Sequence, residues 1–323
     1  MSDLDTLDKK LLYHLDRNSR QPLSRIAKTL NRDKTYLSTR IKNLEEQGII
    51  LNYYTVVDAF KLGYICLRIY IQYQYVSEQK KKEIISYFVK NKHTWCIAAM
   101  EGEFDLAVFF WVRDINNFYS FWESTLELYG DYFHHHLLSL YIRAEFLKCA
   151  YLLNAQERPK DEQIQITGVG KQITIDTTDF RILQMIASSA REPIGSIAQE
   201  LKESATSIRN RLHRLEETHV IKGFRVNVDI SKLGYRSSKV DIFLSEYGKR
   251  KAILSYIRNN PHLYSINYTT GASHLEFEFH VRDINHLHEI MANLINKFSP
   301  WIRNYKYFFV PRKYKLMYIP EEK

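Results

Sequence analysis

The chain has 323 residues, a length that suits two or more domains, and its 45% hydrophobic and 26% charged residues are typical of a globular protein. No apolar run is long enough to span a bilayer, and the start MSDLDTLDKK has no signal-peptide core, so we expect a cytoplasmic protein. The three cysteines are scattered, which disfavours a disulfide framework or a cysteine metal site. The net charge of +9 favours a polyanionic partner.

One long internal repeat organises the sequence. A shift of 171 residues aligns Asp5 with Asp176 and continues without a gap to Tyr64 and Tyr235, each of which ends a KLGY motif. The motif VRDIN at Val112 recurs with a shift of 169. We therefore expect helix-turn-helix domains at 1–60 and 175–231, βαββαβ domains at 61–153 and 232–323, and a polar linker at 154–174.

The first part of each repeat has the period of amphipathic helices. Leucines at Leu7, Leu11 and Leu15 share one helical face behind an acidic capping pattern. A proline suits the first turn of a second helix, and Asp33 in the first copy and Ser204 in the second are suited to cap a third helix. A short helix, a tight turn and a longer helix predict a helix-turn-helix.

The second part of each repeat mixes strands and helices. In ICLRIYIQY, apolar residues alternate with polar residues such as Arg68, and HLEFEFHV alternates in the same way with Glu276 and Glu278 on its polar face. The predicted order is strand, helix, strand, strand, helix, strand, which is the ferredoxin-like βαββαβ unit. The fold class is α+β.

The third helix of each copy presents a polar, basic face that is suited to DNA. With the leucines and isoleucines turned inward, hydroxyl, amide and cationic groups face outward, and such groups contact phosphates and base edges in a major groove. The bland alternative is a solvated face of a helical bundle. The candidate DNA-binding residues are Lys34, Thr35, Tyr36, Ser38, Thr39, Arg40 and Lys42 in the first copy, and Ser204, Thr206, Ser207, Arg209, Asn210, Arg211 and Arg214 in the second.

These residues carry a resemblance to the Lrp/AsnC family of leucine-responsive transcription regulators. The pattern LDxxDxxLL…DxxxR…IAxxL…RIxxLEExGII…LG covers the amino-terminal part of the repeat, and MEGEFDLAVFFWVRD resembles the hairpin of the family's regulatory domain. The resemblance implies a dimerising regulatory domain and points to Gly102 and Asp105 as residues that bind an amino-acid effector. The second copy has Gly271 but replaces the aspartate with His274. The alternative is that the glycine and aspartate only form a turn.

We predict a sequence-specific DNA-binding regulator that acts as a covalent pseudo-dimer, with double-stranded DNA as its partner and no catalysis, cofactor or metal. Two copies of the chain or the two repeats of one chain would pair through the αβ domains. One alternative is an enzyme similar to siroheme decarboxylases, in which basic residues would replace Thr269 and Thr270 of NYTTGASH. The other is an assembly scaffold. The histidines at 134–136 alternate between strand faces and do not form a metal site.

Overall fold

The computed structural model describes residues 4–159, 164–271 and 273–321, and its fold is α+β as predicted. The chain forms two compact units, and each combines segments from both repeats. The first unit, the head unit, contains 1–58, 146–165 and 173–235, and the second, the barrel unit, contains 59–145, 166–172 and 236–323. The division into five consecutive domains stays a prediction. The two compact units follow another division, in which the helix-turn-helix regions of both repeats form one unit and the βαββαβ halves form the other.

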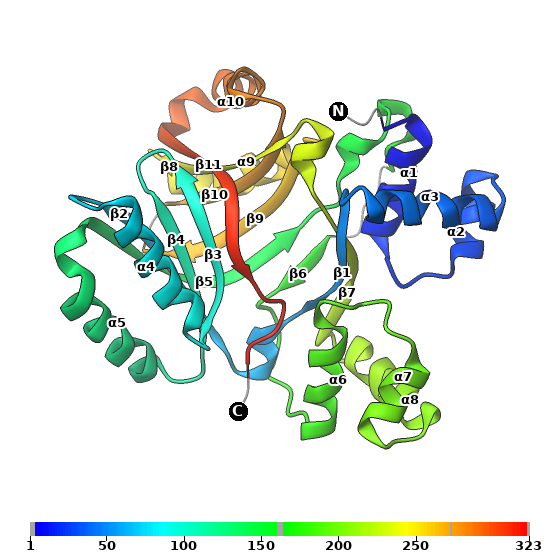
Figure 1. Cartoon of the computed structure of the whole chain (residues 1–323). Coiled ribbons are helices and arrows are strands. Elements are labelled where there is room, and N and C mark those ends of the chain that lie inside the picture. The colour runs from blue at the N-terminus through cyan, green and yellow to red at the C-terminus, as the bar shows by residue number, and fades with distance from the viewer. Residues whose placement is uncertain (1–3, 160–163, 272, 322–323) are drawn as a thin grey trace. The chain divides into compact units, whose positions relative to one another are not determined.

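The head unit contains two helix-turn-helix regions (Figure 1). Their elements are α1 (Thr6–Arg17), α2 (Leu23–Leu30), α3 (Lys34–Glu46) and β1 (Ile50–Val57), and α6 (Thr177–Ala187), α7 (Ile194–Leu201), α8 (Ala205–Glu217) and β7 (Ile221–Val228). Asp33 accepts hydrogen bonds from the first backbone N–H groups of α3, and Ser204 does the same for α8, as the sequence predicts. Gly48 follows α3 with φ +63°, a left-handed conformation that ends the helix.

Strands β1 and β7 pair in an antiparallel ladder that joins the two regions. Ile50 lies opposite Val228 and Val57 lies opposite Ile221, so the pairing is symmetric under the repeat shift of 171. Flanking backbone hydrogen bonds follow the same symmetry: Asp58 N–H donates to the Val220 carbonyl, and Asp229 N–H donates to the Ile49 carbonyl. A self-complementary contact of this kind is characteristic of a two-fold dimer interface, and here one chain provides both sides.

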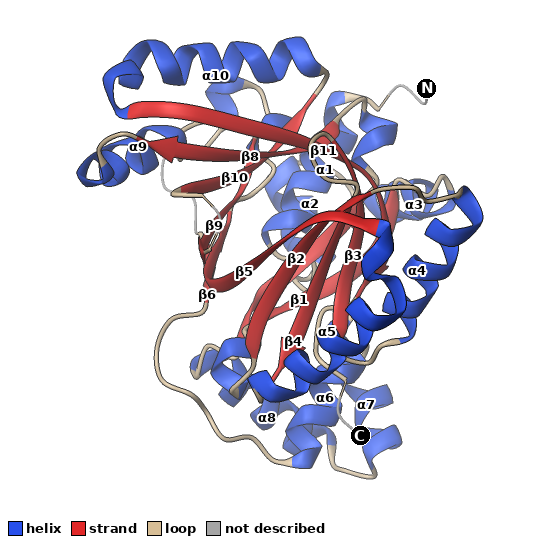
Figure 2. Cartoon of the chain, turned by 90° about the vertical axis from the view of Figure 1, so that its left-hand side faces the viewer, coloured by secondary structure: helices blue, strands red, loops and turns tan. Residues whose placement is uncertain are grey.

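The barrel unit is built from two βαββαβ halves. The first contains β2 (Ile65–Tyr73), α4 (Glu78–Lys90), β3 (Thr94–Glu101), β4 (Leu106–Val112), α5 (Ile115–Tyr129) and β5 (Phe133–Phe146). The second contains β8 (Arg236–Leu244), α9 (Arg250–Ile257), β9 (Leu263–Thr270), β10 (Leu275–Val281), α10 (Ile284–Phe298) and β11 (Ile302–Leu316). Helices α4 and α5 accompany the first set of strands, and α9 and α10 accompany the second (Figure 2).

Eight of these strands close into a ring. The order is β2-β4-β3-β11-β8-β10-β9-β5, and β5 also pairs with β2. The two halves therefore meet along two seams, β3–β11 and β9–β5, both formed within one chain. Closure leaves no free edge among these eight strands, which limits edge-to-edge pairing with other chains.

Both faces of β2, β8 and β10 are largely buried. One face packs under the helices, with Leu67, Ile69 and Phe110 in its core. The opposite face turns into the barrel, and there Arg68 is fully buried and Glu276 is 1% exposed. The alternating sequence pattern predicts one apolar and one polar face, but ring closure removes the polar face from water as well.

The segment predicted as a linker contains a short strand, β6 (Gln165–Thr167), which pairs next to β5. Strand β5 ends at Phe146, and the predicted domain limit of 153 lies beyond it, after a short 3-10 helix at Ala150–Leu152. Leu152 and Leu153 pack in the core around α1. Across the described ranges, no helix is long and apolar enough to cross a membrane.

Candidate functional site

The start of α3 exposes most of the predicted DNA-binding residues of the first copy. Leu37, Ile41 and Leu44 are buried, which fixes the orientation of the helix. The predicted DNA-binding residues that are exposed on its remaining surface are Lys34, Thr35, Tyr36, Ser38, Thr39 and Lys42. The geometry is that of a helix whose amino-terminal half is open to a macromolecular partner.

Helix α8 repeats this arrangement with different side chains. Ile208, Leu212 and Leu215 are buried, while Thr206, Arg209, Asn210 and Arg214 are exposed and Ser207 is half-buried. Ser204 serves as the cap, with its hydroxyl accepting a hydrogen bond from Ser207 N–H at 3.0 Å. The two open faces are therefore similar in position and different in chemistry.

Arg40 is only partly available for DNA because its guanidinium holds the carboxylates at the start of α1. It lies 2.9 Å from Asp8 and 2.7 Å from Asp5, and it donates to the Tyr36 hydroxyl. These hydrogen bonds, that to Asp8 above all, raise the pKa of Arg40. Burial opposes ionisation of Asp5, but the backbone N–H of Asp8 and the guanidinium outweigh it and lower the pKa of Asp5. Arg40 thus joins α3 to the start of α1 through ion pairs, and we call this contact the arginine lock.

The second copy contains the same lock. Arg211 lies 2.7 Å from Asp176 and 2.8 Å from Asp179, which are the residues equivalent to Asp5 and Asp8. Hydrogen bonds to these two carboxylates, the one to Asp176 first, raise the pKa of Arg211. Arg214 also pairs with Asp179. Of the predicted DNA-binding residues, these three arginines pair with carboxylates at the start of a neighbouring helix, and Arg214 remains exposed as well.

The hairpin proposed for an effector has clear structural contacts. Asp105 accepts a hydrogen bond from Tyr73 N–H at 2.8 Å and so caps the end of β2. Gly102 has φ +150°, and a Cβ there would lie 3.1 Å from Phe308 and from the Tyr307 carbonyl of β11. The glycine is required by close packing and by its backbone conformation. Effector binding at this hairpin stays a prediction.

The second hairpin preserves the contact with another side chain. His274 Nδ1 accepts a hydrogen bond from Leu244 N–H at 2.7 Å. Leu244 is equivalent to Tyr73, and His274 is equivalent to Asp105. The substitution therefore exchanges one backbone acceptor for another, and this finding favours the reading of both positions as turn residues.

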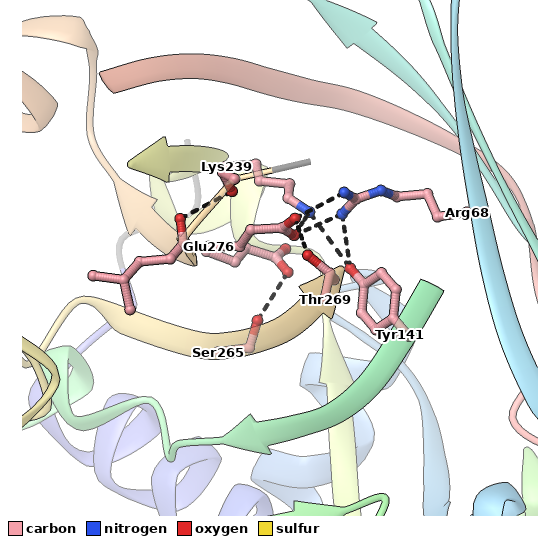
Figure 3. Close-up of polar contacts among 9 residues, drawn as sticks. Arg68, Tyr141, Lys239, Ser265, Thr269 and Glu276 are labelled. Atoms are coloured by element: carbon pink, nitrogen blue, oxygen red, sulfur yellow. Dashed lines mark hydrogen bonds and ion pairs between the residues drawn. The ribbon is translucent and has the colours of Figure 1, made fainter. Parts of the chain in front are cut away.

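A buried charge network lies inside the barrel (Figure 3). Its centre is Glu276 on β10, which pairs with Arg68 on β2 at 2.7 Å and with Lys239 on β8 at 2.6 Å. Thr269 donates to the same carboxylate at 2.6 Å, and the Tyr141 hydroxyl accepts from Arg68 at 3.1 Å. The network links the two halves across the ring.

The charges of this network shift the pKa values of its members. Desolvation disfavours charged Glu276, but Arg68 and Lys239 outweigh it and lower the pKa of Glu276. Asp241 lies nearby, and burial, together with the charge of Glu276, raises its pKa to about 7. Our sequence reasoning missed these residues as a group. The available signal was that charged residues fall on the same strand face in both halves.

The helix-turn-helix geometry agrees with comparisons to known proteins. A family model described as winged helix-turn-helix DNA-binding matches residues 4–50 and 175–222. These ranges contain helices α1 to α3 and α6 to α8. An uncharacterized HTH-type transcriptional regulator of Pyrococcus furiosus is 33% identical over 129 residues, 40% of this chain and 85% of that protein. Regulatory protein AsnC of Haemophilus influenzae is 26% identical over 122 residues, 38% of this chain and 81% of that protein. The chain belongs to the Lrp/AsnC family and contains two of its units in tandem, as predicted.

The solved structure of the siroheme decarboxylase NirDL shares the two-unit fold along the whole chain. Its TM-score is 0.66 at 15% identity, and the match covers 99% of this chain and 95% of that one. A structure of the same enzyme with an iron-uroporphyrin III analogue matches with a TM-score of 0.65. The prediction of a protein without catalysis is contradicted by this finding, because an enzyme has this tandem fold. At such low identity the likeness concerns the fold alone.

Proposed function

We propose that the chain is a sequence-specific DNA-binding transcription regulator in which α3 and α8 of one molecule contact two half-sites. The observation that carries this proposal is the pair of open, polar helix faces, repeated in one compact unit and joined by the symmetric β1–β7 ladder. Helix-turn-helix dimers contact successive half-sites in this way. A covalent link raises the effective concentration of the second helix, so two weak contacts suffice.

The contacts that determine sequence preference are assigned to the exposed residues of the two helices. Arg40 and Arg211 are assigned to positioning α3 and α8, because their guanidiniums bind carboxylates of α1 and α6. The first face offers Tyr36, Ser38 and Thr39, whereas the second offers Ser207, Arg209 and Asn210 at the equivalent positions. Asn and Arg make paired hydrogen bonds to adenine and guanine edges. We therefore propose that the preferred site is asymmetric.

Fluorescence anisotropy with the full chain tests this function. The duplex probes are the region upstream of the chain's own gene and a random sequence of equal length, each at several salt concentrations. We expect tighter binding to the upstream probe and a steep fall of log affinity with log salt. Arg209→Ala and Lys34→Ala should each weaken binding, while Lys82→Ala on α4 removes one exposed charge outside both helix faces and serves as the matched control.

Two outcomes would contradict the proposal. One is weak, salt-independent binding to both probes, and the other is an equal loss of affinity in Lys82→Ala and Arg209→Ala. Site selection from random duplexes tests the asymmetry separately. Perfect palindromes among the selected sites would refute the asymmetric site without refuting DNA binding.

A second candidate function is a reaction on a tetrapyrrole, as in siroheme decarboxylase. The specific observation in its favour is the likeness of fold to NirDL along the whole chain. Against it, Thr269 in the NYTTGASH segment is bonded to Glu276 rather than free to bind a ligand. Absorbance titration of the full chain with iron uroporphyrin III tests this candidate. A shift of the porphyrin absorbance that saturates at one equivalent of protein would support this candidate. An unchanged spectrum would rule it out.

A further inference from the structure

Three arginines of the barrel unit converge on one tyrosine beside the β9–β5 seam. The Arg143 guanidinium lies 3.8 Å from the centre of the Tyr268 ring, and that of Arg250 lies 4.8 Å from the same ring. Arg258 donates to the Tyr268 hydroxyl at 3.1 Å. Cations stack on aromatic faces in this way, but two guanidiniums on one ring also repel each other.

The positive charge of this cluster exceeds the negative charge available to it. Glu145 is held by Arg258 through two hydrogen bonds of 3.0 Å, and it accepts a third from the Tyr268 hydroxyl at 2.6 Å. Arg143 lies 3.5 Å from the same carboxylate. Among the residues that the structure describes, Glu145 is the only carboxylate within ion-pair distance of the three arginines. One carboxylate thus serves two of the three guanidiniums, and Arg250 pairs with none of the described carboxylates.

Two of the arginines retain unused donors. Arg143 Nε is buried and has no hydrogen-bond partner within the described part of the chain, although its side chain as a whole is 34% exposed. Arg250 is half-buried, and its Nε donates to the His274 carbonyl at 2.9 Å. The remaining guanidinium N–H groups of Arg250 face no carboxylate of the described residues. A buried, unpartnered donor beside excess charge is costly unless an anion binds there.

The other seam of the barrel provides an internal comparison. Strands β5 and β11 begin at residues 133 and 302, so Arg143 is equivalent to Arg312. Arg312 pairs in the β3–β11 ladder with Ala99, at the position where the second half has Tyr268. The helices α4 and α9 align with a shift of 169, so the first half has Lys81 and Val89 where the second has Arg250 and Arg258. The cluster is therefore absent from the equivalent seam, and strand pairing does not require it.

From these contacts we propose that Arg143, Arg250 and Arg258 form a binding site for a small multivalent anion that carries carboxylate or phosphate groups. The planar guanidinium matches both groups with paired hydrogen bonds. Arg143 and Arg250 supply the hydrogen-bond donors for the anion. Arg258 and Glu145 hold the Tyr268 hydroxyl, which fixes the ring against Arg143 and Arg250. The site does not depend on DNA binding, because it contains none of the residues assigned to DNA. Tyr268 lies in the NYTTGASH segment considered for the tetrapyrrole, but the small anions tested below bind or fail to bind independently of iron uroporphyrin III.

Isothermal titration calorimetry of the full chain tests the site, with citrate and inorganic phosphate as separate probes at constant ionic strength. We expect at least one probe to bind with one-to-one stoichiometry. Arg143→Gln and Arg250→Gln should each weaken binding by about tenfold or more, as expected for loss of charge-assisted hydrogen bonds. Arg312→Gln is the matched control from the other seam and should leave affinity unchanged. Binding of citrate alone would identify a carboxylate ligand, and binding of phosphate alone would identify a phosphate ligand.

Arg250→Gln keeps the test decisive even if Arg143→Gln does not fold, because removal of Arg250 leaves no carboxylate unpaired. Thermal unfolding without ligand confirms that each variant is folded. Failure of both probes to bind at millimolar concentration would overturn the proposal. So would an equal loss of affinity in Arg250→Gln and Arg312→Gln, since binding would then follow net charge and not the cluster.

Discussion

In the two helix-turn-helix regions, one arginine of α3 and its equivalent in α8 hold the same pair of carboxylates in the same geometry. Equivalent positions inside the barrel differ in charge. Arg68 and Lys239 correspond to each other, and both are cationic, but Glu276 of the second half corresponds to Ala107 of the first. The first half therefore supplies a buried cation, and the second half supplies a cation together with the carboxylate that pairs with both.

The difference shows which parts of the fused chain have diverged. The arginine lock of each helix-turn-helix region lies within one repeat, although a buried ion pair of 2.7 Å between Asp16 of α1 and Arg225 of β7 also joins the two regions. In the barrel interior, Arg68 of the first half finds its carboxylate only in the second half. Two first halves would bring buried arginines together without a carboxylate, and such uncompensated charge is strongly destabilising. The interior thus disfavours pairing of two first halves, whereas a second half supplies the carboxylate that Arg68 needs.

The largest effect is expected from Glu276→Ala. This change leaves Arg68 and Lys239 buried without their shared carboxylate, and breaking a buried ion pair costs about 3–5 kcal/mol of unfolding free energy. Denaturant unfolding of the full chain measures the loss. The triple variant Arg68→Met, Lys239→Met, Glu276→Ala removes both cations as well and should recover most of it. A triple variant no more stable than Glu276→Ala would show that packing, and not charge, makes the interior specific.

A smaller, pH-dependent effect is expected from Asp241→Asn. The pKa of Asp241 rises from its ordinary 3.8 to about 7 in the fold through burial and the charge of Glu276. Between these values the folded state binds more protons at this residue than the unfolded state, so its contribution to stability falls as pH rises from about 4 to about 7. Asparagine removes this fall. The variant should be more stable than the wild type at pH 8 by about 1–3 kcal/mol, with a smaller difference at pH 4.5.

The difference between variant and wild type is the quantity to measure, because several histidines titrate in the same range with the opposite sign. Burial lowers the pKa of these histidines, so their contribution to stability rises with pH; they are His14, His93, His136 and His286. They are common to both proteins, and their effect cancels in the difference. An Asp241→Asn variant with the same pH profile as the wild type would show that Asp241 is ionised across the range.

Much of the fold was predictable from local patterns in the sequence. Helix caps at Asp33 and Ser204, the inward leucines and the repeat itself are short-range signals, and each was confirmed. Ring closure was not predictable, because the alternation around Arg68 looks the same whether the polar face meets water or another sheet. The arginine locks were also missed: Arg40 was assigned to DNA, although the aligned pairs Asp5/Asp176 and Arg40/Arg211 had repeated together.

The smallest effect is expected in the arginine locks, where it separates the two helix-turn-helix regions. Arg40→Ala leaves Asp8 without a cation, and we expect a loss of about 1–2 kcal/mol of unfolding free energy. Arg211→Ala should cost less, because Arg214 still pairs with Asp179, whereas the first copy has Asn43 at the position equivalent to Arg214. Adding Arg214→Ala to Arg211→Ala should bring the loss to the level of Arg40→Ala. Equal losses in the two single variants would show instead that Arg214 does not support α8, and that the two locks are alike in strength as well as in geometry.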